Sequence, residues 1–225
     1  MRKRGIWVKK GGKVSIAVIR RLPRYYRHLS ELRQQGIIRI SSNALGKSMG
    51  LTASQIRQDL FCFGGFGQQG YGYNVENLRD EIGDILGMNR GHNAIVLGAG
   101  NLGRALIENF KFANNGFCLV AAFDVNTDMV GTTLGGIPVY HVDELDDYLM
   151  SHRVSVGVLT VPRSVATATA ERLVQGGVKG IWNFTNTELP LGDTDVIVEN
   201  VHFADSLLTL SYMISEPSRQ KEGEE

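Results

Sequence analysis

The chain has 225 residues, of which 43% are hydrophobic, so it is long enough for one or two domains with a substantial core. Its two cysteines, Cys62 and Cys118, lie far apart, with no CxxC pair and no histidines at ligand spacing, which argues against a disulfide or metal site. No run approaches the ~18 apolar residues that span a bilayer, and the basic N-terminus lacks the apolar run of a signal peptide, so we expect a cytoplasmic protein.

The net charge of +1 hides a strong asymmetry along the chain. Residues 1–60 contain fourteen Lys and Arg residues and only two acids, whereas residues 91–225 contain eight basic and seventeen acidic residues. This N-terminal excess is larger than solubility requires and indicates a polyanionic partner. Residues 1–13 are basic and contain glycine, so they form an arm that either follows a phosphate backbone or has no role.

The segment from Ser15 to Gln35 has apolar residues at three- and four-residue steps, which predicts helical structure that ends at Gly36. Pro23 interrupts this pattern. We expect it either to divide the segment into a short and a longer helix or to lie in the first turn of the second helix.

Residues 41–60 predict two short helices joined by a turn at Gly50. Thr52 is placed to cap the second helix, and Gln55 three residues later would complete a capping box. A plain helical hairpin has the same pattern, but the surrounding positive charge favours a helix-turn-helix whose second helix binds DNA. The polar and basic residues expected to contact DNA are Lys47, Thr52, Ser54, Gln55, Arg57, Gln58, Gln68, Gln69, Arg20 and Arg21.

Residues 61–73 alternate glycine with aromatic residues. A phosphate-binding loop is one interpretation, but no strand precedes it and no Lys-Ser/Thr pair follows, so a β-hairpin fits better. A hairpin after a helix-turn-helix is the wing of a winged helix, with its tip near residues 67–70 beside the minor groove or the sugar-phosphate chain. Asn74 is then expected to cap a third helix over 75–86.

An apolar strand over 94–97 runs into Gly98-x-Gly100-x-x-Gly103 and then into a helix-forming segment, which is the dinucleotide-binding fingerprint. In this pattern Gly98 permits the turn, Gly100 the close approach of a pyrophosphate, and Gly103 the packing of helix on strand. The N-terminus of the helix offers N–H donors and a positive dipole end to the phosphates.

The next strand, 119–123, ends at Asp124, which lies 21 positions after Gly103. An acid at this distance bonds the ribose hydroxyls of the dinucleotide and disfavours a 2′-phosphate, so NAD(H) is preferred over NADP(H). The alternative is that Asp124 only begins a turn. Further strands over 137–140, 154–161, 180–184 and 195–199 alternate with helices, as in a parallel sheet.

Ligands bind such sheets at the carboxyl ends of the strands. The residues expected to contact the dinucleotide from this chain are Gly98, Ala99, Gly100, Asn101, Leu102, Gly103, Asp124, Thr160, Pro162, Asn183 and Phe184. The sequence therefore predicts an α/β protein: a winged helix-turn-helix domain over 1–88, a Rossmann-type domain over 89–201, and a C-terminal segment over 202–225. No catalytic residue and no metal ligand is predicted.

Residues 202–215 predict a helix whose apolar residues cover too much of its circumference for one packed face. Such a helix is either buried in its own fold or packed on a second subunit. About the last eight residues are polar, and we expect them to be disordered.

Together these features resemble the redox-sensing transcriptional repressor Rex family. The stretches that carry the resemblance are Arg21–Tyr26, Thr52–Asp59, Phe63–Tyr73, Gly98–Gly103, Leu159–Pro162 and Val198–Val201. The resemblance implies a homodimer that binds a palindromic operator and represses genes of fermentative or anaerobic metabolism. It also implies that NADH releases the protein from DNA, while NAD+ competes and favours the bound form.

In the family the C-terminal helix is swapped into the partner subunit, and an aromatic residue near its start, here Phe203, reaches the partner's nicotinamide pocket. In some members an Asp before that aromatic pairs with an Arg of the wing. His202 and Gln69 stand at these positions here, so the charged pair is absent. A neutral or histidine-mediated hydrogen bond with some pH sensitivity would replace it, or His202 only faces solvent.

A small NAD-dependent oxidoreductase with a basic appendage is the rival interpretation. No tyrosine is followed by lysine four residues later, and Lys111, Lys179 and Lys221 do not lie at the carboxyl end of a predicted strand. A regulatory NAD-binding subunit without DNA leaves the basic N-terminal segment unexplained. We therefore expect a dinucleotide sensor and not an enzyme.

Overall fold

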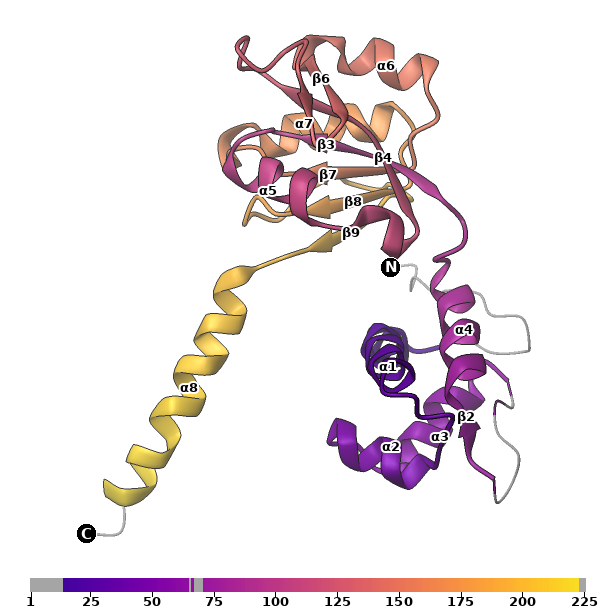
Figure 1. Cartoon of the computed structure of the whole chain (residues 1–225). Coiled ribbons are helices and arrows are strands. Elements are labelled where there is room, and N and C mark those ends of the chain that lie inside the picture. Colours follow the sequence, from indigo (N-terminus) through magenta and orange to yellow (C-terminus); the bar gives the residue numbers. More distant parts are fainter. Residues whose placement is uncertain (1–13, 65, 67–70, 223–225) are drawn as a thin grey trace. The chain divides into compact units, whose positions relative to one another are not determined.

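The computed structural model describes residues 14–64, 66 and 71–222, and for residues 217–222 only the backbone (Figure 1). The predicted arm over 1–13 and the predicted DNA contacts Gln68 and Gln69 lie outside the described residues. The chain divides into two compact units, Met1–Arg90 and Gly91–Glu225. Within the described parts, none of the helices has the length and apolar character needed to cross a membrane.

The described helices of the first unit are α1 (Ile16–Gln34), α2 (Ser42–Met49), α3 (Ala53–Phe61) and α4 (Val75–Leu86). Ser15 caps α1 by accepting a hydrogen bond from the backbone N–H of Val18. Asn74 caps α4 in the same way, as predicted. The apolar faces of these helices enclose one core in which Tyr25, Leu45 and Ile56 are fully buried.

The helix α1 runs unbroken through Pro23, so the predicted division at this proline is wrong. Pro23 is exposed and removes one backbone donor, while the buried residues Leu22 and Tyr25 on either side belong to one continuous core. Burial of that face offsets the loss of a single helical hydrogen bond, because tertiary packing supplies most helical stability in proteins.

The predicted helix-turn-helix is present in α2 and α3. Gly50 ends α2 in the left-handed conformation, with φ of 67°, and Thr52 caps α3 by accepting from the backbone N–H of Gln55. Only half of the predicted capping box forms, because the Gln55 side chain turns to Asp59, to which it donates, and does not accept from the backbone N–H of Thr52.

The described strand of the predicted wing pairs with a segment for which the sequence analysis predicts no strand. The strands β1 (Arg39–Ile40) and β2 (Tyr73–Asn74) form an antiparallel pair in which Ile40 faces Tyr73. The first half of the glycine-aromatic segment is the end of α3 and a turn, so the expectation of a hairpin contained within 61–73 is wrong for the described residues. Its tip lies outside them.

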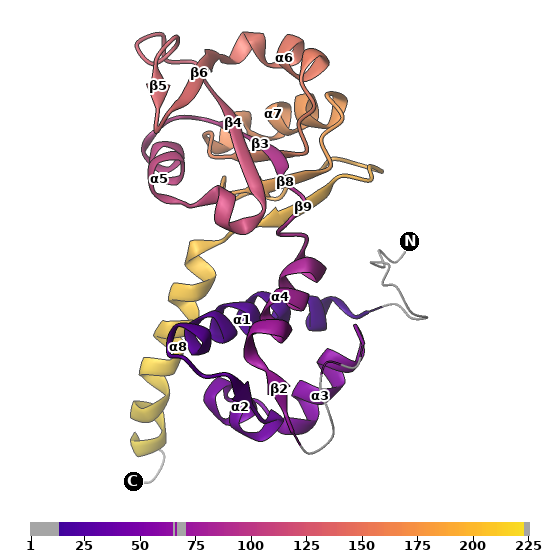
Figure 2. The ribbon, with the colours of Figure 1, turned by 45° about the vertical axis from the view of Figure 1, so that its right-hand side comes forward.

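The second unit is built on a seven-stranded sheet with the order β5-β6-β4-β3-β7-β8-β9 (Figure 2). All neighbouring pairs are parallel except β5 with β6. The strands are β3 (His92–Leu97), β4 (Phe117–Asp124), β5 (Thr133–Leu134), β6 (Ile137–His141), β7 (Val156–Leu159), β8 (Gly180–Asn183) and β9 (Ile197–Asn200). The predicted parallel α/β sheet is confirmed, with β5 as an addition.

Both faces of this sheet are covered by helices, which is why the central strands β3 and β7 are buried along most of their length. The helices α6 (Leu145–Ser151) and α7 (Arg163–Gln175) pack on one face, and α5 (Asn101–Asn109) with the 3-10 turn η1 (Phe112–Asn115) packs on the other. A short 3-10 turn, η2 (Val142–Glu144), leads into α6. The chain order reverses between β3 and β7, and ligands bind open sheets at such a switch point.

The last helix, α8 (Phe203–Glu222), carries exposed apolar side chains along its described length. They include Leu207, Leu208 and Met213, each about two-thirds exposed. These side chains do not belong to the hydrophobic clusters of the second unit. The helix also continues to Glu222, so the tail predicted to be disordered is helical up to that residue, in keeping with the helix propensity of its Arg, Gln, Lys and Glu.

Candidate functional site

The glycine loop follows β3 and leads into α5, as the fingerprint predicts. Gly98 has φ of 95°, and a Cβ on Gly103 would lie 1.8 Å from the carbonyl oxygen of Gly98. Both positions therefore require glycine for the fold itself. By contrast, nothing lies within 4 Å of a Cβ built on Gly100, so the space beside this residue is open. The first N–H groups of α5, at Asn101, Leu102 and Gly103, have no acceptor within the helix and suit a phosphate.

Asp124 lies at the end of β4, directly beside the glycine loop. Its Oδ2 accepts from the backbone N–H of Ala99 at 2.5 Å, and its Oδ1 accepts from that of Asn126 at 2.8 Å. The carboxylate thus begins the turn after β4 and also holds the loop. A carboxylate has about four lone-pair sites, so acceptor capacity remains for ribose hydroxyls.

Thr160 connects β7 to the glycine loop across the switch point. Its Oγ1 lies 2.9 Å from the carbonyl oxygen of Leu97 and 2.7 Å from that of Gly98, and the hydroxyl donates to them. The structure therefore brings Thr160, Asp124 and the Gly98–Gly103 loop together at the carboxyl ends of β7, β4 and β3. Pro162, two residues on, is the exposed N-cap of α7.

Asn183 was predicted as a ligand contact, but the structure gives it a supporting role. Its side chain is 1% exposed. Its Nδ2 donates to Thr187 O and to Asn200 Oδ1, and its Oδ1 accepts from the N–H and the hydroxyl of Thr185. Every hydrogen-bonding position of the amide is therefore occupied within the chain. It shapes the loop after β8 and has no free group for a dinucleotide.

The aromatic residues predicted for the site lie at the end of β8 and the start of α8. Phe184 is partly buried, and its ring lies 4.6 Å from that of Trp182 and 6.1 Å from that of Phe203. Phe203 itself is 63% exposed. Most of its ring surface is thus open to a further contact.

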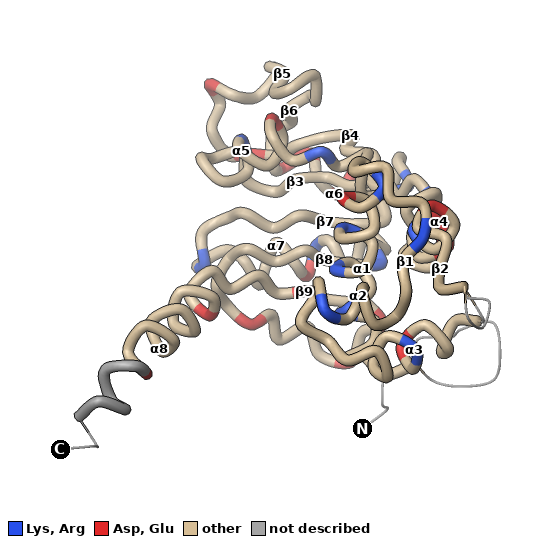
Figure 3. Tube along the Cα trace, turned by 60° about the horizontal axis from the view of Figure 1, so that its bottom comes forward, with Lys and Arg blue, Asp and Glu red and all other residues tan. Residues whose placement is uncertain are grey.

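The candidate nucleic-acid interface of the first unit consists of exposed side chains on and near the helix-turn-helix. Figure 3 shows Lys and Arg along α1, α2 and α3. The predicted contacts that are exposed are Arg20, Lys47, Thr52, Ser54, Arg57 and Gln58. Arg57 donates to the hydroxyl of Ser42 at 3.0 Å, which joins α3 to the start of α2.

Two of the predicted DNA contacts, Arg21 and Gln55, are hydrogen-bonded to a buried acid. Asp59 is 1% exposed and accepts two hydrogen bonds from the guanidinium of Arg21 and one from the amide of Gln55. Tyr25 donates a fourth. Burial raises the pKa of Asp59, but the hydrogen bonds from Arg21, Tyr25 and Gln55 outweigh it and hold the pKa below its usual value.

The net charge of the segment alone does not reveal the structural role of Asp59. The signal was available: it lies on the inward stripe of α3 beside Ile56 and Leu60, where an acid must find donors. The guanidinium of Arg21 is committed to this pair, so the structure assigns Arg21 a role in joining α1 to α3.

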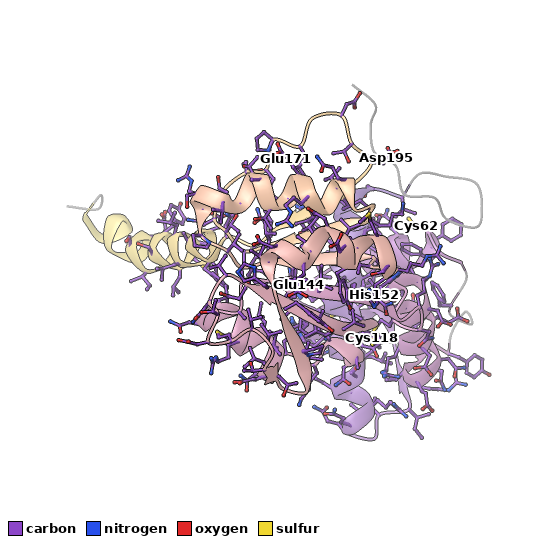
Figure 4. All side chains as sticks on the ribbon, turned by 90° about the horizontal axis from the view of Figure 1, so that it is seen from above. Cys62, Cys118, Glu144, His152, Glu171 and Asp195 are labelled. Carbon is purple, nitrogen blue, oxygen red and sulfur yellow. The ribbon has the colours of Figure 1, made fainter. Side chains whose placement is uncertain are left out.

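The described residues contain no group of three or more His, Cys, Asp or Glu side chains that could hold a metal ion. Both cysteines are free and exposed (Figure 4). Cys62 follows α3 in the first unit, while Cys118 lies on β4 in the second.

Comparisons with known proteins match both units. Residues 13–60 match a family model described as a putative DNA-binding protein N-terminus, and residues 89–187 match one described as a CoA binding domain. The redox-sensing transcriptional repressor Rex of Thermoanaerobacter pseudethanolicus is 48% identical over 209 residues, covering 93% of each chain. That of Clostridium beijerinckii is 47% identical over 93% of this chain and 99% of its own. The chain belongs to the Rex family.

Solved structures of Rex proteins extend this similarity to the fold. A Rex-family repressor called RSP, in complex with NAD+ and operator DNA, matches with a TM-score of 0.86, 48% identity and coverage of 94% of this chain and 97% of its own. RSP in complex with NADH matches with a TM-score of 0.86 and 45% identity, over 93% of this chain and 98% of its own. The predicted Rex resemblance is therefore confirmed, as is the predicted fold of a DNA-binding domain followed by a Rossmann-type domain, while exchange of the last helix between subunits stays a prediction.

One departure from the Rex pattern has a structural counterpart. His202, which stands where some members have an Asp, lies just before α8. Its Nδ1 is 3.2 Å from Asn186 Oδ1 and its Nε2 is 3.5 Å from Glu188 Oε1. His202 thus contacts the loop after β8 of its own chain and does not only face solvent.

Proposed function

We propose that this chain is a DNA-binding transcriptional repressor that senses the ratio of NADH to NAD+. The observation that supports this most strongly is the presence, in one Rex-family chain, of a complete dinucleotide loop and a helix-turn-helix with an exposed polar second helix. The proposed parts are residues 1–88 for operator DNA, 89–201 for the dinucleotide and 202–225 for the dimer.

The dinucleotide would be held by its pyrophosphate and its ribose. The backbone N–H groups of Asn101, Leu102 and Gly103 suit the pyrophosphate, and the open space beside Gly100 allows it to approach. Asp124 would accept the ribose hydroxyls and repel a 2′-phosphate, which gives NAD(H) its advantage over NADP(H). Ala99, Thr160, Pro162 and Phe184 complete the proposed contacts.

The dimer would be formed by α8. A helix with leucines, a tyrosine and methionine exposed over half of their surface needs an apolar partner, because burying each such side chain contributes ~1.5–3 kcal/mol. A second copy supplies this partner if the helix is exchanged between subunits, and Phe203 would then reach the partner's nicotinamide pocket. We propose that the dimer has two arrangements, one that binds the operator and one that does not. NADH and NAD+ shift the dimer between them only through their different affinities for the two arrangements.

We further propose that the chain is a regulator and not an enzyme. None of the proposed dinucleotide contacts is a Lys, Tyr or His, the groups that most often move protons for a dehydrogenase. The named relatives are repressors. A repressor acts on chromosomal DNA, which in bacterial relatives such as these places its action in the cytoplasm.

The proposal is tested with the full chain and an AT-rich inverted-repeat promoter fragment in a gel retardation assay. We expect retention without dinucleotide and with NAD+, release on titration with NADH, and little effect of NADPH. Absence of DNA binding, or release by NAD+ but not by NADH, would overturn the proposal. Retention should fall steeply with salt, since phosphate contacts release counterions.

A further inference from the structure

The buried carboxylate of Asp59 makes four hydrogen bonds to side chains, and they come from two helices. From α1, Arg21 donates through Nε at 2.6 Å and through Nη2 at 2.8 Å, and Tyr25 donates its hydroxyl at 2.7 Å. From α3 itself, one turn earlier, Gln55 donates through Nε2 at 2.7 Å. With all its neighbours acting as donors, Asp59 is held as an ionised acceptor.

This environment determines which way the Gln55 amide faces. An ionised carboxylate only accepts hydrogen bonds, so the atom of Gln55 that touches Asp59 must be the nitrogen. One N–H of the amide is thereby used, while the second N–H and the carbonyl oxygen Oε1 remain. Gln55 is partly exposed on α3, between the exposed residues Ser54 and Arg57.

The two groups that remain on Gln55 match one base. Adenine presents the N7 acceptor and the N6 amino donor side by side in the major groove, and a glutamine amide pairs with both through one N–H and its oxygen. A free glutamine must lose rotamer freedom to make this pair, whereas one that is already bonded to Asp59 has lost part of that freedom on folding.

We infer that Gln55 reads an adenine in each operator half-site and that Asp59 is the residue that positions its amide. The inference rests on the proposed function, since it names how the same helix selects DNA. Arg21 and Tyr25 fix the carboxylate from α1, and the carboxylate fixes Gln55. Arg21, Tyr25 and Asp59 thus link the core of the first unit to base selection without themselves touching DNA.

A purely structural role for Asp59 makes a different prediction. If Asp59 only joins α1 to α3, its replacement weakens binding to every duplex by the same factor. If it positions Gln55, replacement removes discrimination at one base pair and leaves the others unchanged. Asp59→Asn tests this because an Asn side chain has the same size but brings its own N–H donors, which compete with the amide of Gln55.

The experiment measures fluorescence anisotropy of the full chain on an inverted-repeat duplex selected by wild type from a randomised pool. A panel then replaces each A·T pair of the half-site in turn with G·C, in both half-sites. Wild type should lose about tenfold in affinity at the position read by Gln55, within the range of a bidentate contact. In Gln55→Ala and in Asp59→Asn, the loss of affinity on replacing that A·T pair should shrink to about twofold or less, and the losses at the other positions should stay as in wild type.

Asn43→Ala, which removes an exposed amide of α2 that is not among the predicted DNA contacts, serves as the control and should keep the tenfold discrimination. In the Gln55→Ala background, Asp59→Asn should change nothing further at that position. Far-UV circular dichroism and NADH binding identify any variant that fails to fold, and Gln55→Ala, a surface change, carries the test if Asp59→Asn does not fold.

The inference is overturned if Gln55→Ala retains discrimination at every A·T position, or if Asp59→Asn lowers affinity uniformly and keeps the profile of wild type. Failure of the proposed function looks different, since wild type itself would then select no duplex from the pool, and the inference would fall with it.

Discussion

The hydroxyl of Thr160 lies 2.7 Å from the carbonyl oxygen of Gly98 and so ties the end of β7 to the dinucleotide loop after β3. These residues lie 62 positions apart in the chain and meet because β3 and β7 are neighbours at the switch point of the sheet. A Cβ on Gly98 would approach Thr160 O to 2.9 Å, so the two backbones are also in close contact. Contacts within the chain therefore hold the loop in place.

Replacing Thr160 by Val removes the hydroxyl and leaves the shape of the side chain nearly unchanged. We expect a loss of about 1 kcal/mol in the free energy of unfolding of the second unit, because a partly buried hydrogen bond is lost. NADH affinity should fall as well, since the loop is less fixed. Thr160→Ser keeps the hydroxyl and is the control in thermal unfolding and NADH titration; equal losses in both variants would contradict this role.

Gly100 and Gly103 offer a matched pair that separates ligand binding from folding. Nothing lies within 4 Å of a Cβ on Gly100, and its φ of −66° suits alanine. Gly100→Ala should therefore keep the melting temperature while weakening NADH binding about tenfold or more, because the methyl group occupies the approach of the pyrophosphate.

Gly103→Ala should instead lower the melting temperature of the second unit by several degrees, since its Cβ would lie 1.8 Å from Gly98 O. Differential scanning calorimetry measures the melting temperature of both variants, and isothermal titration calorimetry measures their affinity for NADH. An unchanged NADH affinity in Gly100→Ala would show that the pyrophosphate lies elsewhere.

Asp59 predicts how the stability of the first unit depends on pH. Its pKa is lower in the folded state than its ordinary value of 3.8, so the unfolded chain binds the proton more readily. The stabilisation is complete above that ordinary value and is lost as pH falls through the lower folded pKa. Urea unfolding of wild type between pH 2 and 7 should show this loss of stability at the acid end.

Asp59→Asn should remove that part of the acid dependence, since the amide does not titrate. We also expect it to be less stable than wild type at pH 7, where it leaves Arg21 without a charged partner. Parallel pH profiles for the two proteins would mean that Asp59 does not contribute to acid unfolding.

The exposed apolar residues of α8 predict a specific effect on assembly. Leu207→Glu places a charge where the proposed second subunit packs, so it should convert the dimer to a monomer while leaving the thermal unfolding of both units unchanged. Ser206→Glu adds the same charge at an adjacent exposed polar position and should retain a larger fraction of dimer than Leu207→Glu. Sedimentation velocity measures both, and a dimeric Leu207→Glu would contradict the proposed role of α8.

Local signals in the sequence predicted much of this structure. The caps at Thr52 and Asn74 and the turn at Gly50 each depend on contacts within four residues, so α3 and α4 could be placed from the sequence. The glycine loop was predictable for the same reason, because its spacing encodes a strand, a turn and a helix that are contiguous in the chain.

Pairings between distant residues could not be read in this way. The strand β1 exists because Ile40 pairs with Tyr73, and Asn183 is buried because Asn200 and Thr187 bond its amide. The role of Arg21 depends on Asp59, 38 residues later. In the sequence, an arginine that pairs with a distant acid cannot be distinguished from one that is free on the surface. Continuity of α1 through Pro23 likewise reflects tertiary packing that propensity alone does not contain.

NADH and NAD+ are proposed to have opposite effects on operator binding through one site. This proposal is tested most directly by fluorescence anisotropy of the full chain on its operator duplex, at constant total dinucleotide and varied ratio of NADH to NAD+. We predict that bound DNA falls as the NADH fraction rises and that Gly100→Ala needs a higher total dinucleotide concentration for the same response, because both dinucleotides carry the pyrophosphate. A bound fraction that does not change with the ratio would contradict the account.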